Sequence, residues 1–316
     1  MTTNTVRAKT VRARTVRPRT VRARRRPTSA GWGLLAPFLV LYLLFLIGPT
    51  LYGFVISLFD VSLVRSGLSH FVGLSNYLEA VRTVAFWQSM WHTVLFTLLT
   101  TPPLVLVALG LAVLTDRLRR LRWFYRLVFF APYVVPVAVA TLIWTWLYTP
   151  QLGLYGKWLS TVGITPPNWL GDPNWAMLSV VIMTVWWTLG FNFVLYLAGL
   201  QDIPRDLYEA SSVDGASPWT QLTRITVPLL RRTTILVTVL QILASLKIFD
   251  QIYLITSGSG GPNQAIRPAL EYVYDLGFTD YRVGYASAAS MLLFLLTLAV
   301  SLAWLLLVRR SGEEGV

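Results

Sequence analysis

Few residues in this chain have the types and spacing that could perform chemistry. The chain has no cysteine, which excludes a disulfide framework and a thiolate metal site. The only two histidines, His70 and His92, lie too far apart in the sequence to suggest a site. The glycine-rich run at 257–262 is not followed by the Gly-Lys-Ser/Thr of a phosphate-binding loop, so we expect a flexible turn there. The sequence therefore predicts no catalytic residue, no metal site and no enzyme activity in this chain.

The polar residues that stand out lie inside apolar segments. Thr188 and Asn192 are four residues apart, as are Gln241 and Ser245, so each pair shares one face of a helix. Trp187 places an aromatic ring beside the first pair. Polar groups in such segments are costly unless they have partners. They indicate either hydrogen bonds between helices or the path of a polar solute.

Lys247 and Asp250 lie within the fifth apolar segment. They are three residues apart and can pair on one face of a helix. We predict a structural ion pair here, in preference to a role in recognising a charged substrate.

The composition identifies the environment of these residues as a membrane. Of the 316 residues, 55% are hydrophobic and only 13% are charged, whereas about a quarter of the residues in a typical soluble domain are charged. Six apolar runs each reach the roughly 20 residues that a transmembrane helix needs. They lie at about 32–59, 91–115, 124–149, 175–200, 230–256 and 284–308. The chain is therefore predicted to be an all-α integral membrane protein with six transmembrane helices.

The N-terminal segment 1–30 carries ten basic residues and no acidic residue, and its sequence repeats with a period of five. It is predicted to be disordered, because it has no apolar face and repels itself. It could bind nucleic acid, but we favour contact with anionic lipid at the cytoplasmic side and expect no nucleic-acid partner. The membrane domain then covers 31–310 and a C-terminal tail covers 311–316.

The basic residues also predict the orientation. With the N-terminus in the cytoplasm, 21 of the 27 basic residues fall on the cytoplasmic side and five on the other side, as the positive-inside rule requires. Both termini and the loop 201–229 are then cytoplasmic. On the other side, Ser75 or Asn76 can cap a short helix that leads to an interfacial Trp87.

The loop 201–229 is predicted to hold two short helices along the membrane face. Asp202 and a proline two residues later can begin a helix at about 204–213. Gly215 can end it, since glycine accepts the left-handed conformation at low cost. Ser217, followed by a proline, can begin the second helix.

The spacing within this loop resembles the EAA loop of ABC importer permeases. The chain has Glu209–Ser211, three residues, Gly215, nine residues and then Ile225–Pro228. The family pattern is Glu-Ala-Ala, three residues, Gly, nine residues and Ile-x-Leu-Pro. Ser211 and Val227 depart from this pattern, but both changes leave the glycine joint intact.

The similarity extends over roughly 30–310 and excludes the N-terminal tail. FVGLSNY at 71–77, NWLGDPNWA at 168–176 and LITSGSGGP at 254–262 resemble the sugar-permease branch, whose members include maltose, lactose and glycerol-phosphate permeases. This resemblance implies a type I ABC importer permease fold of the MetI-like kind, in the bacterial plasma membrane. It also implies alternating access driven by ATP hydrolysis on a separate subunit.

The resemblance implies that the loop docks as a coupling helix on an ATPase. Glu209 would face the ATPase and Gly215 would permit the tight turn, whereas a solvated surface carboxylate is the alternative for Glu209. The other residues that we assign to coupling are Ala210, Asp214, Ile225 and Pro228. ATP and Mg would be used by the ATPase, and no cofactor is expected on this chain.

The resemblance also locates sugar contacts mid-membrane on the fourth and fifth spans, where polar side chains lie beside aromatic rings. The residues that we assign to this path are Trp187, Thr188, Asn192, Gln241 and Ser245. Interhelical hydrogen bonding is the alternative for each of them. The expected partners are a second, non-identical permease subunit, two ATPase subunits, an extracytoplasmic solute-binding protein and membrane lipids.

Two other functional classes stay open. A proton- or ion-driven carrier would need intramembrane carboxylates or histidines as relays, and only Asp250 is placed in that way. A membrane-anchored scaffold that acts through the Arg-rich tail would leave the six spans and the coupling loop unexplained. Deletion of residues 1–26 separates these alternatives, because transport should survive if the tail only sets topology and contacts lipid.

Overall fold

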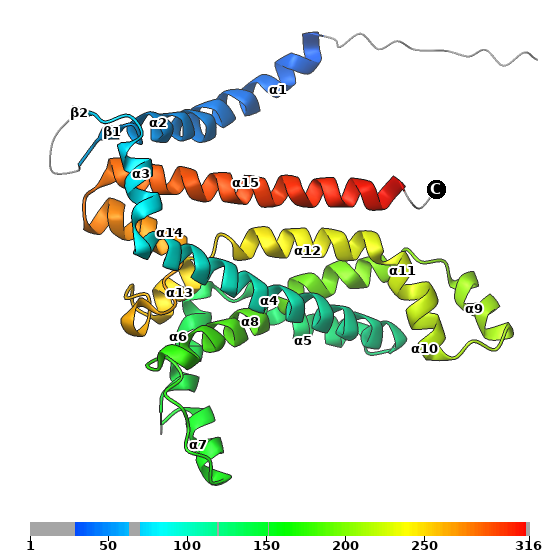
Figure 1. The fold of residues 1–316 in the computed structure, drawn as a ribbon. Coiled ribbons are helices and arrows are strands. Elements are labelled where there is room, and N and C mark those ends of the chain that lie inside the picture. Colours follow the sequence, from blue (N-terminus) through cyan, green and yellow to red (C-terminus); the bar gives the residue numbers. More distant parts are fainter. Residues whose placement is uncertain (1–28, 63–69, 119, 151, 314–316) are drawn as a thin grey trace, which may run out of the picture. The chain divides into compact units, whose positions relative to one another are not determined.

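The computed structural model describes residues 29–62, 70–118, 120–150 and 152–313 (Figure 1). The Arg-rich repeat within 1–28 and the end of the predicted C-terminal tail, 314–316, lie outside the described residues. The internal contacts divide the chain into two units, Met1–Leu51 and Tyr52–Val316.

The first apolar run is helical and contains one wide turn. It comprises α1 (Ser29–Tyr42), a π-helical turn (Leu43–Ile47) and α2 (Gly48–Ile56). The π-helical turn ends two residues before Pro49, which lacks the N–H that would continue an α-helical ladder. Pro37 lies inside α1, so only the second of the two prolines coincides with a change in helix type.

The second unit holds the remaining elements. Strand β1 (Phe59–Asp60) pairs antiparallel with β2 (His70–Phe71), with Phe59 opposite Phe71. The helices, in chain order, are α3 (Ser75–Arg82), α4 (Val84–Arg117), α5 (Arg122–Val134), α6 (Val137–Tyr148), α7 (Leu154–Thr161), α8 (Pro173–Gln201), α9 (Arg205–Val213), α10 (Pro218–Gln221), a π-helical turn (Leu222–Thr226), α11 (Val227–Leu229), α12 (Arg231–Ser245), α13 (Asp250–Ile255), a 3₁₀ turn (Pro262–Gln264), α14 (Ala269–Tyr274), a second π-helical turn (Asp275–Thr279) and α15 (Val283–Glu313).

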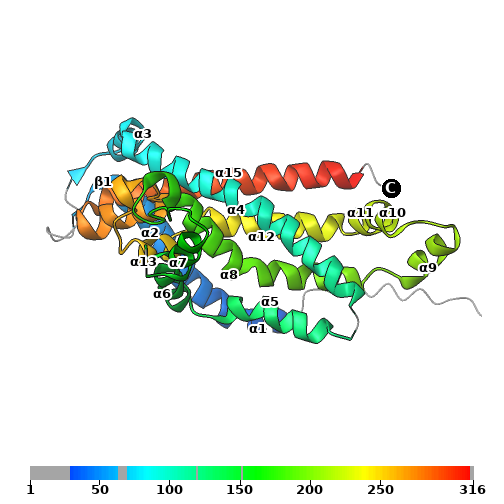
Figure 2. The same ribbon diagram turned by 90° about the horizontal axis from the view of Figure 1, so that it is seen from below.

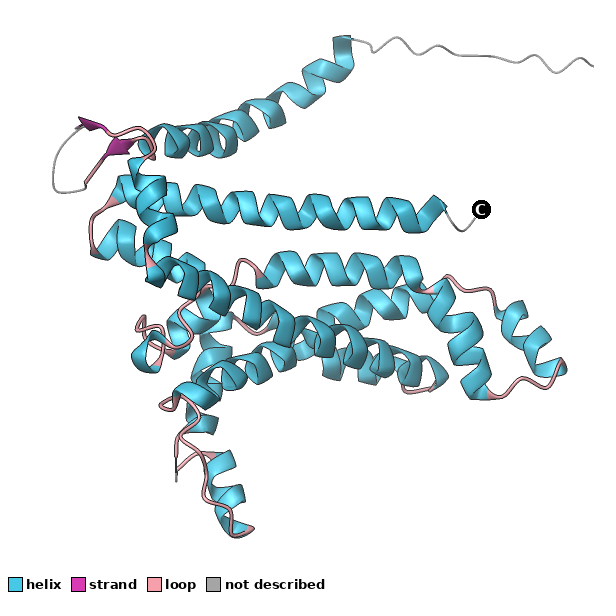
Figure 3. Cartoon of the chain, viewed as in Figure 1, coloured by secondary structure: helices cyan, strands magenta, loops and turns pink. Residues whose placement is uncertain are grey.

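The long helices of the second unit run side by side. Helices α12 and α15 run nearly parallel in both views, and α4 and α8 run obliquely to them, whereas α3 and α6 lie across one end and α9 and α10 project at the other (Figure 1, Figure 2). Helix α8 is central to the packing. It contacts α6 and α13 in a cluster around Trp144 and Met183, and α4 and α12 in a cluster around Phe193 and Leu230. The described chain is helical nearly throughout, as Figure 3 shows.

Four described helical stretches are long and apolar enough to cross a membrane. They are Trp32–Ile56, Val84–Arg117, Pro173–Gln201 and Val283–Trp304. Two further pairs meet the same requirement only when their members are joined across a bend: α5 with α6, and the α10–α11 segment with α12. If each bent pair is one span, the described residues contain six candidate spans, the number predicted, although the fifth then runs from Pro218 to Ser245 instead of over 230–256.

Two of the predicted spans are not straight helices, which corrects the sequence interpretation. The third, expected at 124–149, breaks at Val135 and Pro136, and its two halves meet at 95°. Pro136 explains this break, because proline excludes the preceding residue from the helical region and offers no N–H. The fifth, expected at 230–256, stops being helical after Ser245 and resumes only in α13.

Helices α5 and α8 touch at Gly190. A Cβ at this position would fall on the carbonyl oxygen of Phe129 and close to the Cα of Phe130. Small residues permit this close approach between membrane helices. Gly190 therefore sets the distance between α5 and α8.

We expect Gly190→Ala to destabilise the detergent-solubilised protein by about 1–3 kcal/mol, as overpacking of a filled contact does. The matched control is Gly110→Ala in α4, because a Cβ there meets no atom within 4 Å. The measurement is the thermal unfolding midpoint of the two variants in the same detergent. Equal midpoints would contradict the close contact.

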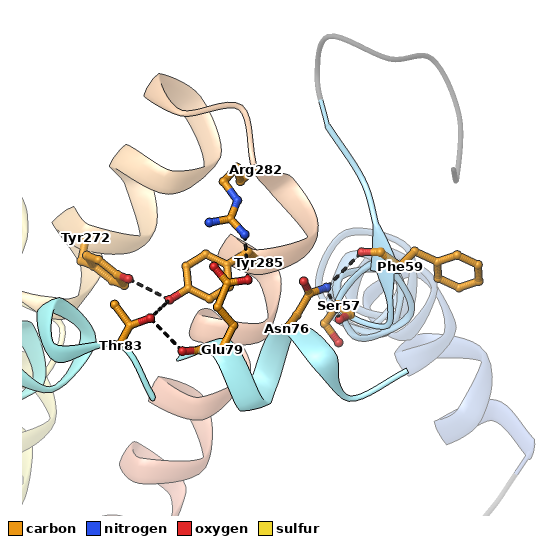
Figure 4. Close-up of polar contacts among 8 residues, drawn as sticks. All are labelled: Ser57, Phe59, Asn76, Glu79, Thr83, Tyr272, Arg282 and Tyr285. Atoms are coloured by element: carbon orange, nitrogen blue, oxygen red, sulfur yellow. Dashed lines mark hydrogen bonds and ion pairs between the residues drawn. The ribbon is translucent and has the colours of Figure 1, made fainter. Parts of the chain in front are cut away.

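One side of α3 is held by an asparagine that was expected to cap it. Leu74 occupies the cap position with no side-chain bond, and Ser75 is the first helical residue. The Asn76 amide instead donates to the backbone carbonyl oxygens of Ser57 at 2.9 Å and Phe59 at 3.0 Å (Figure 4). The prediction of a side-chain cap is therefore wrong, because a tertiary contact uses the same amide.

The other side of α3 is tied to α14 and α15. The hydroxyls of Tyr272 and Tyr285 lie 2.9 Å apart, and Tyr285 also donates to Thr83 Oγ1 at 3.3 Å (Figure 4). Arg282 donates to the Glu79 carboxylate at 2.8 Å. This hydrogen bond raises the pKa of Arg282. Because both members of this ion pair are exposed, it stabilises the fold less than the buried tyrosines do.

Candidate functional site

The predicted loop forms a helical hairpin at one end of the second unit. The first expected helix, at about 204–213, is α9, which begins one residue later at Arg205. Asp202 does not cap it, because Asp202 is the C-terminal cap residue of α8 and Pro204 takes the N-cap position of α9. The second expected helix is α10.

Gly215 makes the joint between the two helices. Its φ of +78° lies in the left-handed region that favours glycine. Its N–H donates to the carbonyl oxygen of Ser212 at 3.1 Å, which closes the end of α9. On the other side of the joint, the Ser217 hydroxyl accepts the N–H of Thr220 at 3.2 Å and caps α10. The local predictions for this turn are confirmed.

Gln221, which the sequence analysis did not single out, joins the two helices of the hairpin through its side chain. The Gln221 side-chain amide, on α10, lies within hydrogen-bond distance of the Ser212 hydroxyl (2.9 Å), the Ser211 hydroxyl (3.0 Å) and the Tyr208 carbonyl (3.3 Å). The Tyr208 hydroxyl in turn lies 2.9 Å from Thr226 Oγ1. These contacts join α9 to the segment after the turn.

The tip of the hairpin presents acidic and apolar side chains to its surroundings. Glu209 and Asp214 are exposed. Val213 is 88% exposed and Trp219 is 71% exposed. The hairpin therefore exposes two large apolar side chains beside two carboxylates. Of the other residues assigned to coupling, Ala210 and Pro228 are exposed and Ile225 is half-buried.

An open cavity of about 710 Å³ lies between the hairpin and the ends of α4, α5 and α8. Asp116 and Arg122 pair across its wall at 2.6 Å. Its charged and polar lining residues are Asp116, Arg117, Arg122, Gln201, Arg205, Tyr208, Glu209, Gln221 and Thr226. The cavity leaves the hairpin attached to the bundle mainly through its base, where Ile203 and Leu230 join the apolar cluster of α4, α8 and α12.

The structure brings three of the predicted polar residues into one buried row of hydrogen-bonded side chains, called the polar chain below. Asn192 on α8 donates to Gln241 Oε1 on α12 at 3.2 Å, and Gln241 donates to Ser245 Oγ at 3.0 Å. Ser245 Oγ lies 3.1 Å from Thr100 Oγ1 on α4. All four side chains are buried. Thr100 was missed, because its polar side chain lies in a run of apolar residues and threonines with no further signal.

Trp187 and Thr188 do not join this chain. The Trp187 indole N–H donates to the carbonyl oxygen of Val135 at 2.9 Å, at the break between α5 and α6. The Thr188 hydroxyl donates to the carbonyl oxygen of Thr184 within its own helix. Trp187 therefore satisfies a backbone group that the break at Pro136 leaves free.

We expect Gln241→Leu to destabilise the protein by about 1–3 kcal/mol, because it leaves the buried Asn192 amide without its Gln241 acceptor and leaves Ser245 Oγ with its Thr100 contact alone. Thr238→Val on the same helix is the control, since the one hydrogen bond of that hydroxyl to a described residue goes to the carbonyl oxygen of Thr234. Thermal midpoints in detergent measure both changes. In the pair Asn192→Leu with Gln241→Leu, the second change should cost less than it does alone. Strictly additive losses would contradict a direct contact.

Lys247 and Asp250 do not form the predicted ion pair. Both side chains are described and exposed, and no ion pair joins them. The prediction assumed one continuous helix, but α12 ends at Ser245 and α13 begins at Asp250. The break removes the three-residue helical spacing on which the pairing depended.

A buried acid lies at the end of the unit opposite the hairpin. Glu271 on α14 is fully buried, and its carboxylate oxygens have no hydrogen-bond partner of ordinary geometry among the described residues. Burial raises the pKa of Glu271 to about 7, and the nearby Asp275 adds to the rise. The Gly260 backbone and Arg267 act in the opposite direction. The described residues include no cluster of three or more His, Cys, Asp or Glu side chains that could hold a metal ion.

Comparison with known proteins gives a consistent family. Residues 105–312 match the model of the family described as binding-protein-dependent transport system inner membrane component. The permease protein of a trehalose/maltose transport system from Thermococcus litoralis is 36% identical, over 89% of this chain and 94% of that protein. The permease protein of a sulfoquinovosyl glycerol transport system from Agrobacterium fabrum is 32% identical, over 87% and 89%.

Solved structures give the same fold. A crystal structure of a bacterial alginate ABC transporter, in complex with a periplasmic protein that binds an alginate pentasaccharide, matches with a TM-score of 0.78 at 22% identity. The match covers 91% of this chain and 96% of that chain. Together with the helical bundle and its apolar spans, the match to the family model shows that this chain is a multi-pass membrane protein and belongs to the family of binding-protein-dependent transport system inner membrane components.

Proposed function

We propose that this chain is one permease subunit of an ATP-driven, binding-protein-dependent importer of carbohydrates or related glycosides. The observation that carries the proposal is the exposed hairpin of α9, Gly215 and α10, clasped by Gln221, in a membrane protein of this family. Relatives named for trehalose/maltose, lactose and sulfoquinovosyl glycerol transport support the solute class.

The hairpin is the surface that docks on the ATPase in this proposal. Its exposed Val213 and Trp219 supply apolar contact area, and Glu209 supplies a charge. The distribution of basic residues puts this surface and both termini in the cytoplasm. The assembly then contains a second, non-identical permease, two ATPase subunits that use ATP and Mg, and an extracytoplasmic solute-binding protein. No cofactor is bound by this chain.

Transport proceeds by movement of rigid elements. Closure of the two ATPase subunits on ATP displaces α9, and the contacts of Gln221 and Tyr208 transmit that displacement to the start of α12. Helix α12 carries Gln241 and Ser245, so movement at the hairpin reaches the buried polar chain through a continuous element. The gating needs no chemical step on this chain.

The polar chain of Thr100, Asn192, Gln241 and Ser245 is the proposed solute-facing element. In this structure its members bond to one another. When α12 moves relative to α4 and α8, sugar hydroxyls can replace these hydrogen bonds with little change in their number. These four polar side chains thus form interhelical hydrogen bonds in one state and contact the solute in the other, which combines the two alternatives that the sequence left open.

The test is reconstitution of the chain in proteoliposomes with its partner permease, ATPase and binding protein. We expect uptake of a labelled sugar from a panel, and ATP hydrolysis that rises when the sugar-loaded binding protein is added. Uptake that follows a proton or ion gradient without ATP would instead support the secondary-carrier alternative. Binding-protein-dependent uptake of a solute with no sugar or glycerol moiety would overturn the solute class alone.

A further inference from the structure

The segment from α5 to α7 crosses the unit once and then turns sideways. Helix α5 has 13 residues, or about 20 Å at the usual rise, and α6 leaves it at 95°. Figure 1 shows α6 running across the long helices, with α7 beyond it, and Figure 2 shows both nearly end-on. A helix perpendicular to the membrane-spanning helices lies parallel to the membrane plane.

Helix α6 has one face buried in protein and one apolar face left open. Ala140, Trp144 and Tyr148 pack in the aromatic cluster against α8. On the other face, Leu142 is 70% exposed and Trp146 is 59% exposed. The exposed face is therefore as apolar as a face that meets lipid in the spanning helices.

Helix α7 continues this apolar surface. Trp158 is 67% exposed, and Leu154 and Val162 are 57% and 62% exposed. The side of α7 that faces the protein carries Tyr155, whose ring lies 5.9 Å from that of Tyr148 on α6. Exposed tryptophan and aliphatic side chains on a short helix are typical of the membrane–water interface.

The scarcity of charged residues in α6 and α7 is a second observation that indicates lipid as the partner of their exposed face. Between Arg126 and Asp172 the sequence contains a single charged residue, Lys157. Lys157 is exposed on α7, where its long side chain can reach lipid phosphates. A surface that docks a soluble protein reversibly carries a polar rim, and a surface in water carries more charge.

We propose that α6 and α7 lie flat in the headgroup and acyl boundary of the bilayer, as an interfacial platform at the end of α5. The covering partner is lipid, because α5, which leads into α6, also exposes the apolar side chains of Leu127 and Val134. This membrane placement of α6 and α7 is separate from the proposed import function and does not depend on the nature of the solute. Its failure would leave the proposed import function intact.

The chain lacks cysteine, so single cysteines can be introduced without prior substitution. The test places a spin label at Leu142→Cys, Trp158→Cys or Val162→Cys in the full-length chain, assembled with its partners in proteoliposomes of defined phospholipid. Collision with oxygen, which enters lipid, is compared with collision with a water-soluble nickel chelate. Leu106→Cys in α4 is the membrane reference and Asp280→Cys, in the loop before α15, is the water reference, since both positions are exposed; both are measured before the binding protein is added.

We expect the three labels to report a depth of about 5–10 Å below the lipid phosphates, between the two references. The variant Trp158→Glu should move the label at Val162 toward the water reference, while the label at Leu142 stays in place. Nickel collision at Trp158 and Val162 equal to that at Asp280 would overturn the proposal. The same would follow if these labels became protected only when the binding protein is added, because the surface would then be a protein contact.

Discussion

Gly215→Pro is expected to abolish solute uptake while the chain still inserts and assembles with its partners. Proline fixes φ near −65°, whereas Gly215 has a φ of +78°. Proline also removes the N–H that bonds to the Ser212 carbonyl. Helix α9 can then no longer turn back so that Gln221 reaches Ser211, and force on α9 no longer reaches α12. The measurement is uptake, together with binding-protein-stimulated ATP hydrolysis, in proteoliposomes.

The substitutions at this joint should form a graded series. Gly215→Asn should be nearly neutral, and Gly215→Ala should cost about 1–2 kcal/mol locally, because only glycine and asparagine adopt this conformation readily. A clash plays no part, since a Cβ at Gly215 meets no atom within 4 Å. The effect therefore comes from the backbone alone.

Gly163 is a matched control for this series. It has a φ of +77°, its N–H donates to Ser160 at 3.1 Å, and a Cβ there also meets no atom within 4 Å. Gly163→Pro imposes the same strain at the end of α7, far along the chain from the hairpin. Coupled transport in Gly215→Pro, or equal losses in the two proline variants, would show that the hairpin is not the coupling element.

Glu271 should make the stability of the protein fall as the pH rises. Its pKa is about 7 in the folded chain against 4.5 as the ordinary value, so the folded state holds the proton more tightly than the unfolded state. The stabilisation is fully present below about pH 4.5 and is lost as the pH rises through 7. The shift corresponds to about 3 kcal/mol. Burial also raises the pKa of Asp275, which acts in the same direction.

The measurement is the thermal midpoint in detergent between pH 5 and pH 8, for the native chain and for Glu271→Gln. Glutamine has the shape of the protonated acid, so this variant should be nearly as stable as the native chain at pH 5 and more stable at pH 8. Asp206→Asn on the exposed α9 is the control and should keep the native pH dependence. An unchanged pH dependence in Glu271→Gln would assign the effect to another group.

The parts of the fold that the sequence predicted correctly depend on neighbours along the chain. The φ of Gly215 and the cap at Ser217 follow from residues within three positions, and both are confirmed. The apolar run at 175–200 matches α8 within two residues at each end. The third run is helical on both sides of Pro136, although its bend of 95° was not predicted.

The contacts that the sequence analysis did not predict depend on groups far apart in the sequence. Asn76 bonds to Ser57 and Phe59 instead of capping α3, because tertiary acceptors compete with the local helix end. The break between α12 and α13 separates Lys247 from Asp250, although no proline marks it. Gln221 gave no sequence signal, since its role comes from three acceptors on another helix.

The sequence by itself determined that this chain crosses a membrane and that a glycine-jointed hairpin interrupts its spans. These properties follow from composition and from interactions within about one helical turn. Only the tertiary structure decided that Asn192, Gln241 and Ser245 meet Thr100, that Trp187 serves the break at Val135, and that α6 and α7 lie across the bundle. Helix packing fixes these contacts, because buried polar groups must find partners wherever the neighbouring helices place them.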